Sequence, residues 1–275
     1  MPTDADAMTT IPCWIITLNP EAPLASALDA ALSAQGLLHQ FVPAVDGRHG
    51  MPPLQGRERI DERKALLRHQ KLLTPRQVGC YLAHYRAVQR AWDEGLERVC
   101  ILEDDVGIED DFARVLAGIA TLPDDVEMVR LMALRIRRRK VVQPVPGAEA
   151  YQLVRPERGW CGCQGYVINR AGMKKLLDHA CVIFEPIDKL VDHFFEFDLR
   201  LFGVEPHVCY ENPHVSSTRT PGHKPPPAPL LLRLLAPLHK LVFSRTRHRY
   251  LHAHASEFYP AEKPAARMGR TERLY

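Results

Sequence analysis

Three adjacent carboxylates, Glu103, Asp104 and Asp105, directly follow the apolar run of residues 99–102. Such a run, without polar alternation, is typical of a strand buried on both faces of a parallel sheet, and α/β proteins bind ligands where such strands end. If the chain stays extended, Glu103 and Asp105 share one face and Asp104 points away. Two hard oxygen ligands suit Mg²⁺ or Mn²⁺. The alternative is an acidic turn after a core strand.

The elements that would position these carboxylates alternate between strands and helices. Strands are expected over residues 13–18, 38–42, 99–102, 127–133, 165–168 and 204–210, with a hairpin over 141–154. Helices are expected over residues 23–35, 62–71, 75–94, 111–121, 170–179 and 188–202, and residues 49–73 are expected to be a surface insertion. This order, without an internal repeat, predicts a doubly wound α/β fold.

The helix that begins after Thr74 has the clearest pattern. Thr74 suits the N-cap, Gln77 completes a capping box, and Gly95 follows the last turn. Apolar residues recur every three or four positions and predict one packed face. His84 lies beside that face, so it is expected to be either a core histidine or a ligand contact.

Charge is distributed unevenly along the 275 residues. Counted from Arg219 to the end, the chain carries a formal charge of +8, against −5 for residues 1–218. Seven cysteines, mostly inside apolar runs, fit reduced thiols in a cytoplasmic protein. No signal peptide is expected in the first ten residues, and no apolar stretch reaches the roughly 20 residues of a membrane span.

Composition changes near residue 219, where a C-terminal tail is expected to begin. Pro225, Pro226, Pro227 and Pro229 predict a stiff linker, and residues 230–243 are rich in leucine and followed by arginines. Pro237 is expected to break or kink a single helix. The tail is expected either to anchor the protein to an anionic membrane surface or to pack as a C-terminal helix.

Six short motifs, in order, resemble glycosyltransferase family 25. They are Ile15-Ile16-Thr17-Leu18-Asn19, Asp46-Gly47-Arg48, Val78-Gly79-Cys80-Tyr81-Leu82-Ala83-His84, Ile101-Leu102-Glu103-Asp104-Asp105, Gly165-Tyr166-Val167-Ile168-Asn169-Arg170 and Pro186-Ile187-Asp188. The resemblance implies a GT-A-like, Rossmann-like domain over residues 11–218 with a mixed, mainly parallel sheet, followed by the tail of residues 219–275.

The same resemblance implies an inverting transfer from a nucleotide-diphosphate sugar such as UDP-galactose. The acceptor would be a hydroxyl of a surface glycan or glycolipid such as lipooligosaccharide, assembled at the cytoplasmic face of the inner membrane. Glu103 and Asp105 would hold Mn²⁺ or Mg²⁺ at the donor diphosphate, and Asp104 would bind a ribose or sugar hydroxyl.

Inversion requires a carboxylate that takes the acceptor's proton. Asp188 is the first candidate because it ends the Pro-Ile-Asp motif, Glu185 is the second, and Asp192 is the third. The alternative for Asp188 is a helix N-cap.

The remaining motif residues are assigned by resemblance. Asn19, Arg48 and His84 would contact the donor, although Arg48 could equally brace a turn. Trp160, Gly165 and Tyr166 would contact the acceptor, with Trp160 as a stacking surface for a sugar ring. Residues 21–35 lack the arginines usual in this family, so Arg48 or Arg76 would have to supply phosphate contacts.

Two other classes of function are alternatives to an active enzyme. One is a catalytically weak family member that binds glycans or nucleotide sugars. The other is a nucleic-acid-binding protein, which the acidic body and the absence of a recognition motif disfavour.

Overall fold

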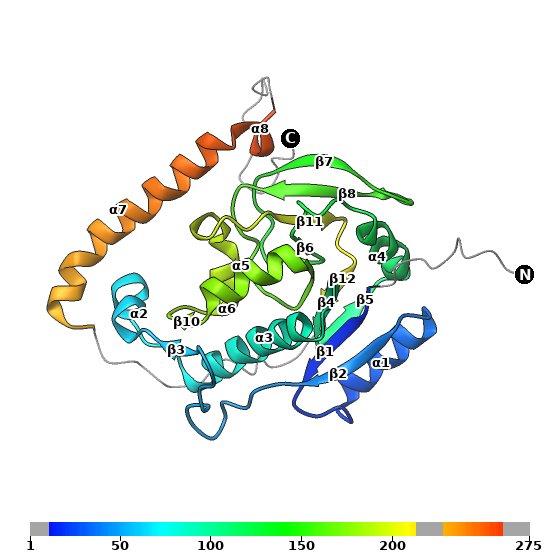
Figure 1. The fold of residues 1–275 in the computed structure, drawn as a ribbon, viewed down its shortest axis with the longest axis horizontal. Coiled ribbons are helices and arrows are strands. Elements are labelled where there is room, and N and C mark those ends of the chain that lie inside the picture. The colour runs from blue at the N-terminus through cyan, green and yellow to red at the C-terminus, as the bar shows by residue number, and fades with distance from the viewer. Residues whose placement is uncertain (1–10, 213–227, 261–275) are drawn as a thin grey trace, which may run out of the picture.

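The computed structural model describes residues 11–212 and 228–260. Its main feature is an eight-stranded sheet, which confirms the expected α/β class (Figure 1). In spatial order the strands are β2 (His39–Pro43), β1 (Cys13–Thr17), β4 (Arg98–Glu103), β9 (Gly165–Asn169), β6 (Met128–Arg130), β11 (Leu201–Glu205), β8 (Ala148–Pro156) and β7 (Arg139–Val145).

The sheet is mixed and mainly parallel, as expected. The pairings give six strands one direction, while β9 and β8 run in the opposite direction. Two short sheets complete the strands: β3 (Arg59–Ile60) pairs with β10 (Val182–Ile183), and β5 (Val106–Ile108) pairs with β12 (Cys209–Glu211).

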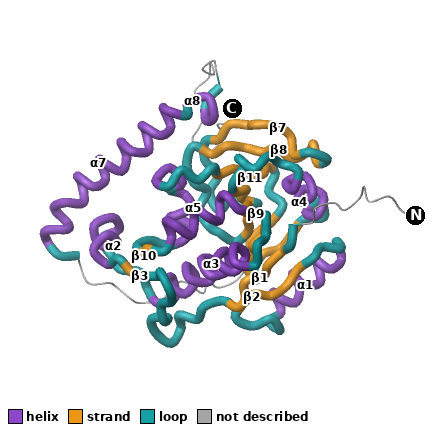
Figure 2. Tube along the Cα trace, in the orientation of Figure 1, coloured by secondary structure: helices purple, strands orange, loops and turns teal. Residues whose placement is uncertain are grey.

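Helices cover both faces of the sheet (Figure 2). They are α1 (Pro23–Ala34), α2 (Glu62–His69), α3 (Pro75–Asp93), α4 (Phe112–Ala120), α5 (Arg170–Ala180), α6 (Ile187–Asp192), the 3-10 turn η1 (Phe194–Glu196), α7 (Leu230–Ala253) and α8 (Ala255–Phe258).

Two apolar cores lie on opposite faces of the sheet because strand side chains alternate. On β1, Trp14 and Ile16 join the core under α3, α5 and α6, whereas Cys13 and Ile15 join the core under α1 and α4. The central strands are therefore buried on both faces, as the unbroken apolar run before Glu103 predicts.

Helix α3 begins as the sequence predicts. The Thr74 hydroxyl accepts the backbone N–H of Gln77, and the Gln77 side chain accepts the N–H of Thr74. At the other end Gly95 adopts a φ of +75°, a left-handed conformation that suits glycine after a helix. The cap fixes where the helix starts and so fixes the heights of Cys80 and His84 beside the sheet.

Several sequence expectations are wrong in detail. The helix expected over 188–202 ends at Asp192, because Phe194 and Phe195 turn into the core and Leu201 starts β11. The strand expected over 204–210 is divided into β11 and β12, since Pro206 has no N–H to donate to a ladder. The 49–73 insertion is built into the molecule rather than lying on its surface, since β3 pairs with β10 and Ala65 of α2 is fully buried.

The described part of the tail contains the long helix α7, at one side of the molecule, followed by the short helix α8 (Figure 1). The expected break at Pro237 is wrong, because α7 continues through this position, and buried Leu232 and Leu251 hold the helix on either side. The expected linker residues Pro225–Pro227 lie outside the described residues. Within the described part of the chain, no helix combines the length and apolarity needed to cross a membrane.

Candidate active site

The carboxylates of Glu103, Asp104 and Asp105, at the end of β4, each have a different environment. Strand β4 ends at Glu103, and Asp104 and Asp105 form a turn into β5, so the expected extended conformation is wrong there. Asp104 accepts the hydroxyl of Thr17 at the end of neighbouring β1. The main-chain carbonyl of Asp105 accepts the N–H of Asn212 at 3.0 Å. The turn, rather than strand alternation, sets the directions of the three side chains.

Two adjoining cavities share the wall that carries these carboxylates. Cavity A has a volume of about 260 Å³ and includes Thr17, Arg48, Arg76, His84 and Asp104 in its lining. Cavity B has a volume of about 330 Å³ and includes Lys71, Gln164, Asp188 and Lys189. Cys80, Glu103 and Asp105 line both. Glu103 and Asp105 are therefore accessible from either side, whereas Asp104 faces cavity A alone.

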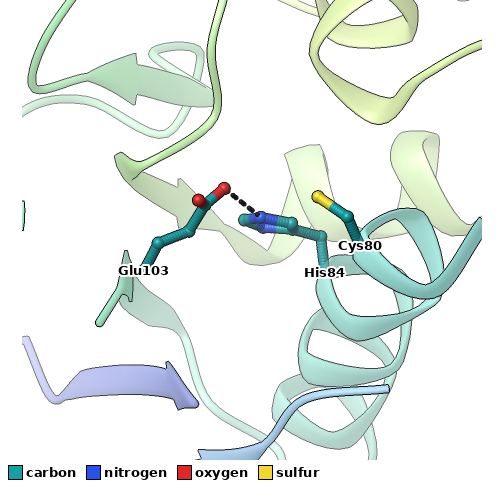
Figure 3. A group of neighbouring side chains, drawn as sticks. All are labelled: Cys80, His84 and Glu103. Atoms are coloured by element: carbon teal, nitrogen blue, oxygen red, sulfur yellow. Dashed lines mark hydrogen bonds and ion pairs between the residues drawn. The ribbon is translucent and has the colours of Figure 1, made fainter. Parts of the chain in front are cut away.

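His84 supports Glu103 from helix α3. It is buried, with 1% of its surface exposed, and Nε2 lies 3.0 Å from Oε1 of Glu103 (Figure 3). Its other ring nitrogen, Nδ1, lies 3.2 Å from the hydroxyl of Tyr166 on β9. The core reading of His84 is therefore confirmed, and because it also lines cavity A, its contact with a ligand stays a prediction.

Asp188 lies in the first turn of α6 and lines cavity B, which Glu103 at the end of β4 also lines. The N-cap of that helix is Pro186, so the capping alternative for Asp188 is wrong. The backbone N–H of Gly162 approaches its Oδ2 at 3.4 Å. Neighbouring Asp192 instead accepts the N–H of Cys161 and pairs with buried Arg130.

Glu185, the second candidate base, is not part of either cavity wall. Its side chain is completely buried and lies between His69, His193 and Arg68, with N–O distances of 3.0, 3.1 and 3.3 Å. Burial alone would raise its pKa, but the hydrogen bonds from His193 and His69 and the charge of Arg68 lower the pKa to about 2. A buried carboxylate with such a low pKa is suited to holding charge, not to accepting a proton.

Arg48 and Arg76 bring positive charge to cavity A. Arg48 also pairs with Asp46 through Nε and Nη2, at 2.8–3.0 Å. Hydrogen bonds from this arginine lower the pKa of Asp46 to about 2. Asn19 lies outside the lining of both cavities, where its Oδ1 accepts the N–H of Glu21 at 3.1 Å.

The three residues expected to contact an acceptor are buried. Trp160 is 1% exposed and packs over Gly203, where an added Cβ would lie 2.0 Å from the indole ring, so a stacking role is wrong. Tyr166 is 2% exposed and contacts His84 rather than solvent. Gly165 packs against Cys209 and Leu102, so its missing side chain serves strand packing.

Cys80 is a site residue that sequence reasoning missed. It precedes His84 by four residues on α3, so both side chains lie on one helical face and both are near Glu103. This spacing was visible in the motif, but only the fold shows that the face borders two cavities.

The described residues therefore contain a group that could hold a metal ion. Sγ of Cys80, a ring nitrogen of His84 and a carboxylate oxygen of Glu103 lie within 4.8 Å of one another. The oxygens of Glu103 and Asp105 on the shared wall also match the ligands that Mg²⁺ and Mn²⁺ prefer.

The sequence is similar to proteins named for lipooligosaccharide biosynthesis and for galactosyl transfer. It is 28% identical over 153 residues to the Haemophilus influenzae lipooligosaccharide biosynthesis protein lic2B, covering 53% of this chain and 54% of that protein. It is 31% identical over 179 residues to Xenopus laevis procollagen galactosyltransferase 1-B, covering 55% of this chain and 28% of that protein. The chain thus spans about half or less of these two relatives.

A third relative aligns over more of its length. The lacto-N-neotetraose biosynthesis glycosyltransferase LgtE of Neisseria meningitidis serogroup B is 26% identical over 211 residues, covering 73% of this chain and 74% of that protein. The family model described as glycosyltransferase family 25 (LPS biosynthesis protein) matches residues 11–191, and this chain therefore belongs to glycosyltransferase family 25.

Proposed function

We propose that this protein is an inverting glycosyltransferase that moves galactose from UDP-galactose to a hydroxyl of a surface glycan such as lipooligosaccharide. The observation that carries the proposal is the arrangement of two cavities around one carboxylate wall. Cavity A contains the guanidinium groups of Arg48 and Arg76, which suit a diphosphate, and cavity B contains the carboxylate of Asp188. The names of the relatives support both the sugar and the glycan.

The donor side has groups for binding and orientation. Guanidinium groups pair with phosphate oxygens through geometry that matches both partners. Thr17 holds Asp104 in place, and His84 holds Glu103, so the wall is fixed before the donor arrives. Glu103 and Asp105 would hold Mn²⁺ or Mg²⁺, which supplies charge neutralisation to the departing nucleotide.

Asp188 is the proposed general base. It lies in the first turn of α6, and the Gly162 N–H approaches one of its carboxylate oxygens. An acceptor hydroxyl in cavity B would pass its proton to Asp188 as its oxygen attacks the anomeric carbon. The attack comes from the side opposite the nucleotide, so a β-linkage results from an α-linked donor.

The tail supports a membrane-bound acceptor. Seven exposed apolar residues of α7 fall within an arc of about 140° at 3.6 residues per turn: Leu230, Leu231, Leu234, Leu235, Leu238, Leu241 and Val242. Exposed Arg245 and Arg249 continue this arc. We call this surface the α7 stripe and propose that it rests on an anionic lipid bilayer, because apolar side chains beside cations fit that surface.

The test is a donor panel with and without Mn²⁺ or Mg²⁺, read by nucleotide release and by the anomeric configuration of the product. UDP-galactose is expected to be the best donor and the product a β-galactoside. Asp188→Asn is expected to lower kcat by about 100-fold or more while UDP affinity stays unchanged. Asp178→Asn, at an exposed carboxylate of α5, is the control. Transfer by Asp188→Asn at the wild-type rate would show that the base lies elsewhere.

A further inference from the structure

Cys80, His84 and Glu103 form a side-chain cluster that the proposed reaction does not need as a unit. Cys80 and His84 lie one turn apart on α3, and Glu103 meets them from the end of β4 (Figure 3). Figure 3 shows the sulfur and the carboxylate on either side of the imidazole ring. The cluster shares only Glu103 with the carboxylate pair proposed for Mn²⁺ or Mg²⁺.

The donor atoms of this cluster select a different class of ion. Mg²⁺ and Mn²⁺ prefer oxygen ligands, whereas a set of thiolate, imidazole and carboxylate suits Zn²⁺. Zinc sites with three protein ligands keep a fourth position for water or substrate. Cys80 and Glu103 line both cavities, so such a fourth position would be accessible from solvent.

Tyr166 can hold His84 in the tautomer that a metal ion requires. Without metal, Nε2–H of His84 can donate to Glu103 while the Tyr166 hydroxyl donates to Nδ1. With metal, Nδ1–H donates to the Tyr166 oxygen and the lone pair of Nε2 is released for the ion. Neighbours that orient a metal-bound histidine in this way are typical of metal sites.

A second cluster with similar ligand types does not qualify. Glu185, His193 and Glu196 also lie close together, but the Arg68 guanidinium is 3.3 Å from Glu185 and 2.9 Å from Glu196. A cation is thus already present between those carboxylates.

We propose that Cys80, His84 and Glu103 bind a Zn²⁺-type ion, with the Cys80 thiol proton passing to solvent, and that this ion inhibits sugar transfer. Inhibition is expected because an ion held by Cys80, His84 and Glu103 takes a carboxylate oxygen from the pair proposed for the hard cation and adds positive charge beside the place of that cation. The inhibitory part rests on the proposed function, whereas the binding part does not.

Cobalt(II) tests the binding directly, because it occupies zinc-type sites and absorbs in the near ultraviolet when a thiolate is bound. The full chain is expected to bind one equivalent with a thiolate band. Cys80→Ser should abolish the band and weaken Zn²⁺ affinity, measured by competition with a chromophoric chelator, by at least tenfold. Tyr166→Phe should keep the band but weaken affinity by about 10- to 100-fold.

The matched control is Cys163→Ser, since Cys163 is buried, lines cavity B and is not part of the cluster. It is expected to keep the band, and circular dichroism checks the fold of each variant. Absence of a thiolate band in the folded wild type, or its persistence in Cys80→Ser, would overturn the proposal.

Inhibition is tested by measuring the rate of sugar transfer with and without micromolar Zn²⁺ at saturating Mn²⁺. The rate of each variant with Zn²⁺ is divided by the rate of the same variant without Zn²⁺. Wild type and Cys163→Ser should lose activity and Cys80→Ser should resist. If transfer occurs but zinc has no effect on wild type, inhibition is refuted and the transferase proposal stands. If no donor is turned over, the cobalt experiment still decides the site.

Discussion

At the scale of single residues, the wall shared by the two cavities depends on contacts between segments that lie far apart in the sequence. Glu103, Asp104 and Asp105 line the cavities where β4 ends. Their partners could not be predicted, because His84 is 19 residues away in sequence and Thr17 is 87 residues away. All three line cavity A, and a turn at Asp104 and Asp105 replaces the strand alternation expected there.

Glu185 shows the same limit more sharply. It is the second candidate base in the sequence, but two of its partners, Arg68 and His69, come from α2, more than 110 residues earlier. Only the packing of α2 beside α6 and η1 reveals that this carboxylate is an internal counter-ion. Local sequence carries no signal of that pairing.

The lowered pKa of Glu185 predicts how stability depends on pH. Because the folded-state pKa is about 2, against 4.5 unperturbed, the ionised carboxylate stabilises the fold above pH 4.5 and this contribution is lost as pH falls toward 2. The shift corresponds to roughly 3 kcal/mol at pH 7, and to roughly 1 kcal/mol at pH 3.

Denaturant unfolding of Glu185→Gln at pH 7 and pH 3 measures this. The variant should lose about 3 kcal/mol at pH 7, since it removes one of the two carboxylates that pair with buried Arg68, and distinctly less at pH 3. The control Glu94→Gln changes an exposed ion pair with Arg90 and should cost under about 1 kcal/mol. An equal loss for Glu185→Gln at both pH values would contradict the assignment.

At the scale of elements, the parts with strong local signals were predicted best. The capping box of α3 and the hairpin β7–β8 depend on neighbouring residues, and both occur where expected. The end of α6 depends on what Phe194 and Phe195 pack against, and the division between β11 and β12 follows from Pro206, so hydrophobic periodicity alone misplaced both.

Helix α3 also positions the wall of cavity A through a glycine. A Cβ on Gly79 would lie 2.5 Å from the carbonyl oxygen of Val45, in the loop that carries Arg48. Gly79→Ala must therefore displace that loop or the helix, at a cost of about 1–3 kcal/mol. We expect a lower melting temperature and a KM for the sugar nucleotide raised several-fold.

Gly118→Ala separates the two effects. Gly118 is also a helical glycine, in α4, and its Cβ would lie 2.2 Å from the carbonyl oxygen of Pro146, but it lines neither cavity. It should destabilise the protein similarly and leave the donor KM unchanged. If both variants changed the KM equally, the loop contact would have no special role in donor binding.

At the scale of the whole molecule, α7 presents its two sides to different surroundings. Leu232 and Leu251 are buried and Phe243 stacks under Arg68, whereas the α7 stripe faces outward. The reading of the tail as a packed C-terminal helix therefore describes its inner side, whereas the membrane-anchor reading of the outer side stays a prediction. Packing fixes its inner side against α2 and η1, and the outer side keeps an exposed apolar surface that a purely structural helix does not need.

Vesicle co-sedimentation tests whether a bilayer covers that surface. The protein should bind vesicles containing phosphatidylglycerol more tightly than pure phosphatidylcholine vesicles, and salt should weaken binding. Leu234→Gln with Leu238→Gln should lower affinity about 100-fold or more, because each buried leucine contributes about 1.5–3 kcal/mol. Arg245→Ala with Arg249→Ala should lower it about 30-fold on anionic vesicles only, at about 1 kcal/mol per cation.

Leu38→Gln with Leu54→Gln is the matched control, since these leucines are 65% and 40% exposed but lie outside α7. This variant should bind vesicles to the same extent as the wild type. If the variants of the α7 stripe also bound vesicles like the wild type, while light scattering showed that they had lost a dimer present in the wild type, a second copy of the chain rather than lipid would cover the α7 stripe. A membrane contact would then have to be sought outside α7, because the cations of α7 without its leucines would provide only salt-sensitive attraction.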